Sequence, residues 1–278
     1  MSTAVTTNEL AAEADQSLAA FTRQLFAGAA EDDLAAHSGE DLQAIAARAY
    51  DFFSGRVPGR TQIRLSPATG NGERSAMTAI EIANDDMPFL VDSTLNVLNE
   101  LGYPILFVLH PIIAARRDAR GKLIEVLGPG TSAEGDVRES FMYIEVAGVV
   151  SEAQRERLKQ ELERTLADVR TAVLDWRPMQ RRVLDAIEAY RRSPPPIPVE
   201  ELTEGMAFLQ WLLDNHFTFL GARDYKFART AESGELEPVP GSGLGILRDP
   251  DMQVLRRGGA PTASKRAAVK AWATLASI

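Results

Sequence analysis

The residues best placed to do chemistry form a short acidic turn at residues 84–90 (NDDMPFL), between an alternating apolar segment and an amphipathic one. The alternation over residues 77–83 predicts a strand. Asp86 and Pro88 predict the start of a helix, because Asp is a favoured N-cap and proline in the first turn leaves no N–H unpaired. Free N–H groups at a helix N-terminus can bind a carboxylate. The candidate ligand-binding residues are therefore Asn84, Asp85, Asp86, Phe89 and Leu90.

A purely structural turn is the alternative interpretation of the same residues. Asp85 and Asp86 would repel a carboxylate, and the side chain of Phe89 occupies room that a ligand would need. The histidines His37, His110 and His216 are isolated, without the regular spacing of metal ligands. We therefore expect no metal site and no catalytic residue in this chain.

Composition narrows the classes of protein further. The formal net charge of −9 argues against a phosphate-backbone binder, so no nucleic-acid partner is expected. The absence of cysteine excludes disulfides and thiolate metal sites and is compatible with a reducing compartment. No apolar run approaches the roughly 18 residues of a spanning helix, and the N-terminus lacks the pattern of a secretory signal. We expect a cytoplasmic protein without a membrane partner.

The remaining pattern predicts the elements that position the turn. Residues 8–54 are alanine-rich with helical spacing, and predicted strands cover residues 61–65, 77–83, 104–115, 122–127 and 141–147. The run 104–115 is nearly continuously apolar, which indicates burial on both faces or an interface. This order is the front half of a βαββαβ domain.

Capping residues and a proline run mark the boundaries of helices. Ser38 is expected to cap one helix, Ser151 and Gln154 to form a capping box, and Gly102 to take a left-handed C-cap. The run at residues 193–198 (SPPPIP) is typical of a stiff, extended linker and is the predicted domain boundary. The glycine-rich run at residues 241–245 is not followed by a helical pattern, so it indicates a hairpin turn and no cofactor-binding loop.

Six segments resemble, in order, the N-terminal region of the large bacterial NAD-dependent glutamate dehydrogenases. They are NDDMPFLVDS (84–93), LHPII (109–113), RESFMYIEV (138–146), LADVRTAVLDW (166–176), NHFTFLGARDY (215–225) and GSGLGILR (241–248). The resemblance covers roughly residues 60 to 257. In that family this region is ACT-like and non-catalytic, and it precedes a remote catalytic domain.

The resemblance implies an α+β fold with an ACT-like, ferredoxin-type βαββαβ domain. The expected bounds are 1–59 for a helical segment, 60–176 for the ACT-like domain, 177–198 for a helix and linker, and 199–278 for the truncated start of a PAS-like domain. ACT modules typically place a small residue, often glycine, just after the proline, where Phe89 stands in this chain.

The implied function is regulation or assembly of an NAD-dependent glutamate dehydrogenase, an oxidoreductase of amino-acid catabolism. NAD belongs to the implied catalytic domain and no cofactor is expected in this segment. The expected partners are that catalytic domain, further copies of the chain through the apolar run Ile105 to Ile113, and an amino-acid effector. The alternative is a free-standing ACT-type sensing or interaction module, and a small independent enzyme is a third option.

Overall fold

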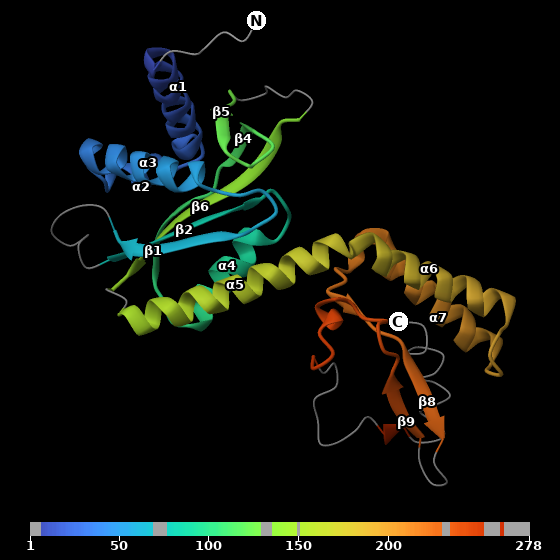
Figure 1. Ribbon diagram of the computed structural model, residues 1–278. Coiled ribbons are helices and arrows are strands. Elements are labelled where there is room, and N and C mark those ends of the chain that lie inside the picture. The colour runs from blue at the N-terminus through green and yellow to red at the C-terminus, as the bar shows by residue number, and fades with distance from the viewer. Residues whose placement is uncertain are drawn as a thin grey trace, which may run out of the picture. The chain divides into compact units, whose positions relative to one another are not determined.

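The computed structural model describes residues 7–68, 77–128, 135–148, 151–229, 234–252 and 262–263. The chain divides into two compact units, Met1–Ala167 and Asp168–Ile278. The division falls inside helix α5 (Glu152–Leu174). Figure 1 gives the course of the chain.

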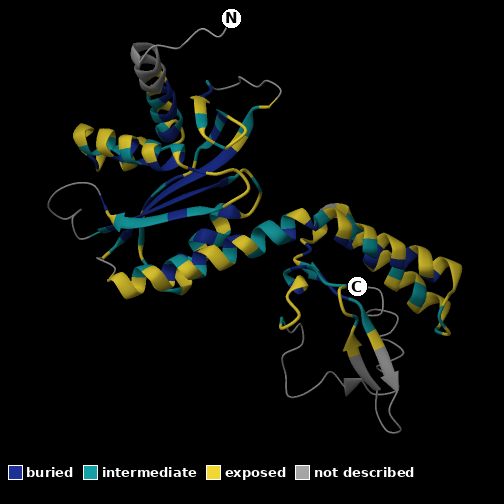
Figure 2. Cartoon of the chain, viewed as in Figure 1, coloured by how far each residue is buried: buried dark blue, intermediate teal, exposed yellow. Residues whose placement is uncertain are grey.

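An antiparallel sheet organises the first unit. Its strands are β1 (Gln62–Pro67), β2 (Met77–Asp85), β3 (Ile105–Leu109), β4 (Ile112–Arg117), β5 (Leu123–Val126) and β6 (Val137–Ala147). The order is β1-β2-β6-β4-β5, and β3 pairs with β6 alongside β4. The central strands β2 and β6 are buried along most of their length (Figure 2).

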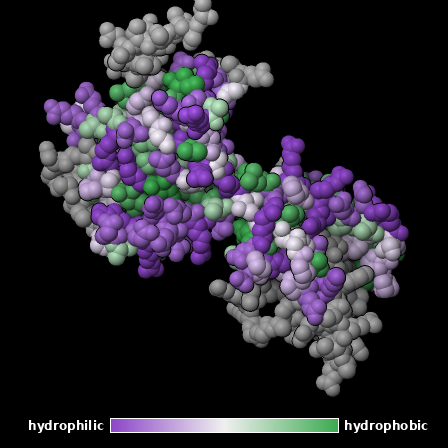
Figure 3. Space-filling view, in the orientation of Figure 1, coloured by the Kyte–Doolittle hydropathy of each residue, from purple (hydrophilic) through white to green (hydrophobic). Residues whose placement is uncertain are grey.

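Helices cover both faces of this sheet. The helices α1 (Thr7–Phe26), α2 (Glu31–Ala35) and α3 (Gly39–Ser54) lie on one side, and α4 (Leu90–Glu100) and the first part of α5 lie on the other (Figure 1). On the first side, Phe21, Phe53 and Phe141 join α1, α3 and β6 through ring contacts. On the second, α5 buries Leu158 and Leu162, while its charged outer side gives the hydrophilic surface visible in Figure 3.

The α+β class is confirmed, but one strand of the predicted ferredoxin-type order is different. The elements β2, α4, β3–β4, β6 and α5 follow the predicted βαββα sequence, with β5 as an additional strand. After α5 the chain continues as α6 (Trp176–Arg192), and β1 occupies the sheet edge beside β2. The fourth strand of the core is therefore β1, which precedes β2 in the chain. Local sequence patterns do not encode where in the sheet such a strand pairs.

Two details of the predicted elements were wrong. The first residue of α4 is Leu90, and Phe89, not Asp86, holds the N-cap position without a side-chain cap. The predicted strand 104–115 is interrupted at His110 and Pro111, which separate β3 from β4. A proline lacks the N–H that a continuous ladder needs.

The predicted caps are confirmed. The Ser38 side chain accepts from the Asp41 N–H, and the Asp41 carboxylate accepts from the Ser38 N–H. Ser151 and Gln154 exchange the same pair of bonds at the start of α5. Gly102 follows α4 with φ 76°, the left-handed conformation that favours glycine.

The second unit combines a helical pair with short strands. The helices are α6, α7 (Val199–Trp211), a π-helical turn (Leu212–His216) and a 3-10 turn (Ile246–Arg248). The strands are β7 (Gly221–Ala222) with β10 (Leu244–Gly245), and β8 (Tyr225–Arg229) with β9 (Gly234–Pro238) and β11 (Thr262–Ala263). Met179, Val183 and Ile187 of α6 share one core with Leu209 of α7.

The run 193–198 connects α6 to α7 within that unit, so it is a loop of a helical pair. The expected bounds of independently folding domains and the PAS-like assignment stay predictions. Residues 264–278, the end of the expected PAS-like segment, lie outside the described residues.

Candidate functional site

The five predicted ligand-binding residues form one continuous turn at the end of β2. Asn84 and Asp85 end the strand, and Leu90 is buried as the first residue of α4. Phe89 is 44% exposed, and its carbonyl accepts the Ser93 N–H at 3.1 Å. The turn therefore anchors the helix through Leu90 and presents the ring of Phe89 at the surface.

Phe89 is the one non-glycine residue with positive φ among the described residues, at 71°. The left-handed conformation costs an L-residue roughly 1–2 kcal/mol. Such strain persists where the surrounding structure fixes the backbone. The position after the proline thus has the conformation that glycine adopts most easily, although its side chain here is large.

Both acids of the turn are engaged by the chain itself. Asp85 pairs with the Arg56 guanidinium and accepts the Gly59 N–H at 3.1 Å. The Asp86 N–H donates to the Arg138 carbonyl at 3.1 Å, and its carboxylate lies 3.3 Å from the Arg138 guanidinium. These contacts favour a structural role for the two carboxylates. Ligand binding by the turn itself stays a prediction.

Behind Asp85 lies a buried ionic network that the sequence analysis missed. Arg56 and Arg117 share the carboxylate of Glu139, and all three side chains are at most 2% exposed. Arg117 also donates to the carbonyls of Phe53, Ser54 and Arg56. It thereby supplies additional donors to carbonyls at and just beyond the end of α3, where intrahelical donors run out.

Two further glutamates occupy the same face of the sheet. Glu81 of β2 binds the guanidinium of Arg64 through both oxygens, at 2.6 and 2.7 Å. Glu145 of β6 lies 3.4 Å from His37 Nε2 and accepts from the Tyr143 hydroxyl. The sequence signal that could have revealed these buried partners was the presence of Glu81, Glu139 and Glu145 within otherwise largely apolar strands.

The opposite face carries a polar row that begins at the turn. Ser140 of β6 is in register with Asn84, and its hydroxyl lies 2.9 Å from His110 Nε2. Burial lowers the pKa of His110, and the charge of Asp86 opposes that shift to a smaller extent. The structure therefore brings the predicted residues Asn84 and Asp86 toward His110, which the sequence analysis left isolated.

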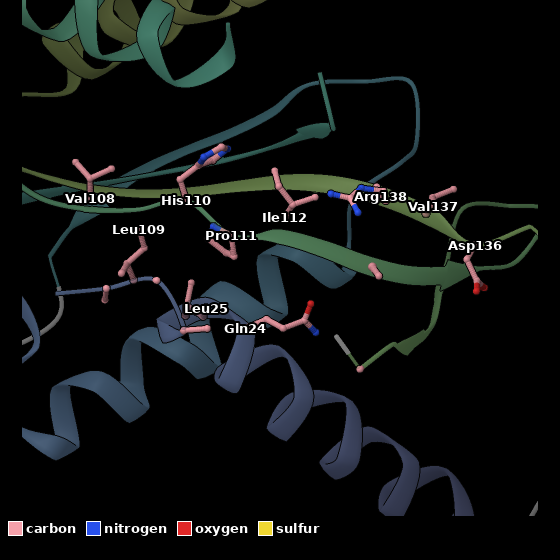
Figure 4. Close-up of a pocket in the computed structure, with 15 residues that line it drawn as sticks. Gln24, Leu25, Val108, Leu109, His110, Pro111, Ile112, Asp136, Val137 and Arg138 are labelled. Atoms are coloured by element: carbon pink, nitrogen blue, oxygen red, sulfur yellow. The ribbon is translucent and has the colours of Figure 1, made fainter. Parts of the chain in front are cut away.

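A cavity of about 860 Å³ lies beside this row, at the break between β3 and β4. Figure 4 shows the side chains of Val108, His110 and Ile112 on one side of the strand. Leu25 and Gln24 of α1 approach from the other side. The cavity is therefore bounded by the end of α1 and by the interrupted strand.

The backbone at this break faces a free edge of the sheet. Ala114 turns its carbonyl outward to accept from the Leu127 N–H, and Pro111 turns its carbonyl inward to accept from Phe141. Neighbouring residues of a strand direct their backbone groups to opposite sides, so His110 and Ile112 present theirs outward. Among the described strands, none pairs with that side, because β5 ends its ladder at Ala115.

Other kinds of site find no support within the described ranges. Among those residues, no three His, Cys, Asp or Glu side chains gather as a metal ion would require. In the same part of the chain, no helix combines the length and apolar character needed to cross a membrane.

Comparison with known proteins places these features in a family. Residues 21–162 match the family described as glutamate dehydrogenase, ACT1 domain, and this match covers the sheet, the turn and the cavity. The chain belongs to that family. The expected identification with the N-terminal region of NAD-dependent glutamate dehydrogenases is thereby confirmed.

Individual relatives agree with the ACT1 assignment. The chain is 35% identical to an NAD-specific glutamate dehydrogenase of Pseudomonas aeruginosa over 178 residues, 64% of this chain and 11% of that protein. It is 32% identical to the Halomonas elongata protein of the same name over 231 residues, 82% of this chain and 14% of that protein. The chain thus spans a small part of the length of these relatives.

Proposed function

We propose that this chain is a non-catalytic regulatory and assembly region of an NAD-dependent glutamate dehydrogenase. That enzyme would oxidise L-glutamate with NAD and water to 2-oxoglutarate, ammonium and NADH in cytoplasmic amino-acid catabolism. The observation that carries the proposal is the ACT1 match over residues 21–162, in a chain that spans 11–14% of its relatives' length. NAD would bind to the catalytic domain, which is then the first partner of this region.

An activity assay tests the non-catalytic part of the proposal. The purified chain, supplied with L-glutamate and NAD, should form no NADH. Turnover that depends on both substrates would overturn it. A free-standing sensor is the alternative, and it gains support if the gene encodes no nicotinamide-binding domain beyond Ile278.

The sheet edge at β3 supports the assembly part. Leu106 is 48% exposed, and residues 103–115 contain no charged side chain. Edge strands that stay unpaired usually carry charges or other protection against pairing. We infer that a second copy of the chain covers this edge along β3, residues 105–109.

Val108→Asp tests this inference, because a charge at the edge opposes pairing. We expect the wild-type chain to sediment as a dimer or larger species and Val108→Asp to sediment as a monomer with an unchanged far-ultraviolet spectrum. The control is Ile124→Asp, which places the same charge at an exposed apolar position on β5. A monomeric wild type, or equal effects of the two substitutions, would contradict pairing through β3.

A further inference from the structure

We propose that the cavity at the β3–β4 break binds a small carboxylate with an apolar body, and that Arg138 holds the carboxylate in competition with Asp86. This inference rests on the proposed regulatory function, for which it names the chemical class of the effector and its site.

The charges around the cavity point to Arg138 as the ligand's partner. Asp136 and Arg138 are the charged residues among the described residues that line it. The Asp136 side chain is nearly buried and accepts from Arg116 at 3.1 Å, so its charge is matched within the chain. The Arg138 side chain is 72% exposed, and its contact with Asp86, at 3.3 Å, is longer than the ~2.7–2.9 Å of a strong charge-assisted bond.

The rest of the lining suits an apolar body. The apolar lining includes Val108 and Ile112 on one side of the strand and Leu25 of α1 on the other, together with Leu109, Pro111 and Val137. Burial lowers the pKa of His110 from its ordinary value, which disfavours a second cation beside Arg138. A single exposed cation beside an apolar lining favours a monocarboxylate over a polyphosphate, which needs several positive charges.

The strand break supplies additional donors for the carboxylate. His110 and Ile112 direct their backbone N–H groups to the free edge, as the inward carbonyl of Pro111 and the outward carbonyl of Ala114 require. Figure 4 shows the Arg138 side chain extending along the strand toward Ile112. One carboxylate oxygen can therefore meet the guanidinium while the other meets an edge N–H.

Ligand binding would act on the turn through Asp86. The Asp86 carboxylate and its N–H both bind Arg138, so Arg138 links the cavity to the strained residue Phe89. A ligand that takes the guanidinium releases the carboxylate of Asp86 and loosens the entry to α4. The signal is thus an exchange of one carboxylate for another on the same cation.

Titrations of the whole chain with isovalerate, L-valine and isovaleramide test the proposal. A ligand that binds the folded chain raises its thermal midpoint in a saturable manner. Isovalerate or L-valine should do so, and isovaleramide, which lacks the carboxylate, should not. A shift with both acids assigns the site to carboxylates in general, and a shift with L-valine alone assigns it to amino acids.

Variants locate the binding. Arg138→Gln should weaken binding about tenfold or more, as expected for the loss of a charge-assisted hydrogen bond. Asp86→Asn should strengthen binding, because it removes the competitor, and a merely structural role of Arg138 would not produce that gain. Arg120→Gln, at an exposed arginine in the turn before β5, should leave affinity unchanged.

Two results would overturn the proposal. One is the absence of a saturable shift with either carboxylate, and the other is unchanged affinity in Arg138→Gln. Binding that ignores Arg138 would place an effector elsewhere and leave the proposed regulatory function standing. NADH formation by the chain would refute the non-catalytic function without bearing on the cavity.

Discussion

Replacement of Glu139 by glutamine probes the buried ionic network most directly. The Glu139 carboxylate accepts from Arg117 Nη2 at 2.7 Å and from Arg117 Nε at 3.0 and 3.1 Å, and it also pairs with Arg56. All three side chains lie out of solvent. Glutamine keeps the shape of the side chain and removes its charge, so Arg117 loses its carboxylate partner.

Removal of one member of a buried ion pair costs about 3–5 kcal/mol, because the other charge stays buried without compensation. Asp85 continues to pair with Arg56, so we expect a loss near the lower end, about 3 kcal/mol. That is a large part of the roughly 5–15 kcal/mol that stabilises a typical domain. The matched control is Glu125→Gln, whose partner Arg116 is 40% exposed, and it should cost about 0–1 kcal/mol.

The assay must report on the first unit alone. All three tryptophans, Trp176, Trp211 and Trp272, lie outside residues 1–167, so their fluorescence does not serve. Hydrogen exchange of peptides from β2 and β6 at increasing urea concentration gives the free energy of opening of the sheet itself. A loss below about 1 kcal/mol in Glu139→Gln, or equal to that of Glu125→Gln, would refute the reasoning.

Two further predictions concern backbone strain and pH. Phe89→Gly should be more stable than Phe89→Ala by about 0.5–1 kcal/mol, because both remove the ring and glycine alone tolerates φ 71°; equal thermal midpoints would contradict strain at this position. In the second unit, the Arg248 guanidinium, helped by the Gly245 N–H, lowers the pKa of Asp175. Ionised Asp175 therefore stabilises the fold above its ordinary pKa of ~3.9, and this contribution is lost as the pH falls through the lowered folded value. Arg248→Gln should reduce the urea midpoint of tryptophan fluorescence at neutral pH and converge with wild type in acid; parallel curves at all pH values would contradict the linkage.

Local signals predicted most of the elements of the first unit. The period of apolar residues located the strands and helices, and the hydroxyl of Ser38 and the glycine at 102 marked helix ends through chemistry that acts within one turn. The start of α4 was misplaced because Asp86 has the properties of an N-cap, yet its carboxylate binds Arg138, which is distant in sequence. The contact between Asp86 and Arg138 thus outweighed the preference of aspartate for a helix N-cap.

The candidate site was less accessible to sequence reasoning. The predicted turn exists, but the cavity beside it depends on contacts between α1 and the β3–β4 break, which lie some eighty residues apart along the chain. His110 was interpreted as an isolated histidine because its partner, Ser140, belongs to another strand. The alternation of apolar and polar residues along a strand indicates which face of the sheet a residue occupies. It does not specify which other strand lies next to that residue.

The position of β1 has a consequence for how the ACT1 region can be divided. Because β1 precedes β2 and pairs along its outer side, from Gln62 opposite Ala83 to Pro67 opposite Thr78, the sheet is complete only with residues from before residue 68. The helices α1 and α3, which cover one face, also come from that part of the chain. A fragment that began at the first strand of the βαββαβ pattern would expose both a strand edge and an apolar face that carries carboxylates. A fragment that keeps this core intact therefore includes the helices upstream of β1.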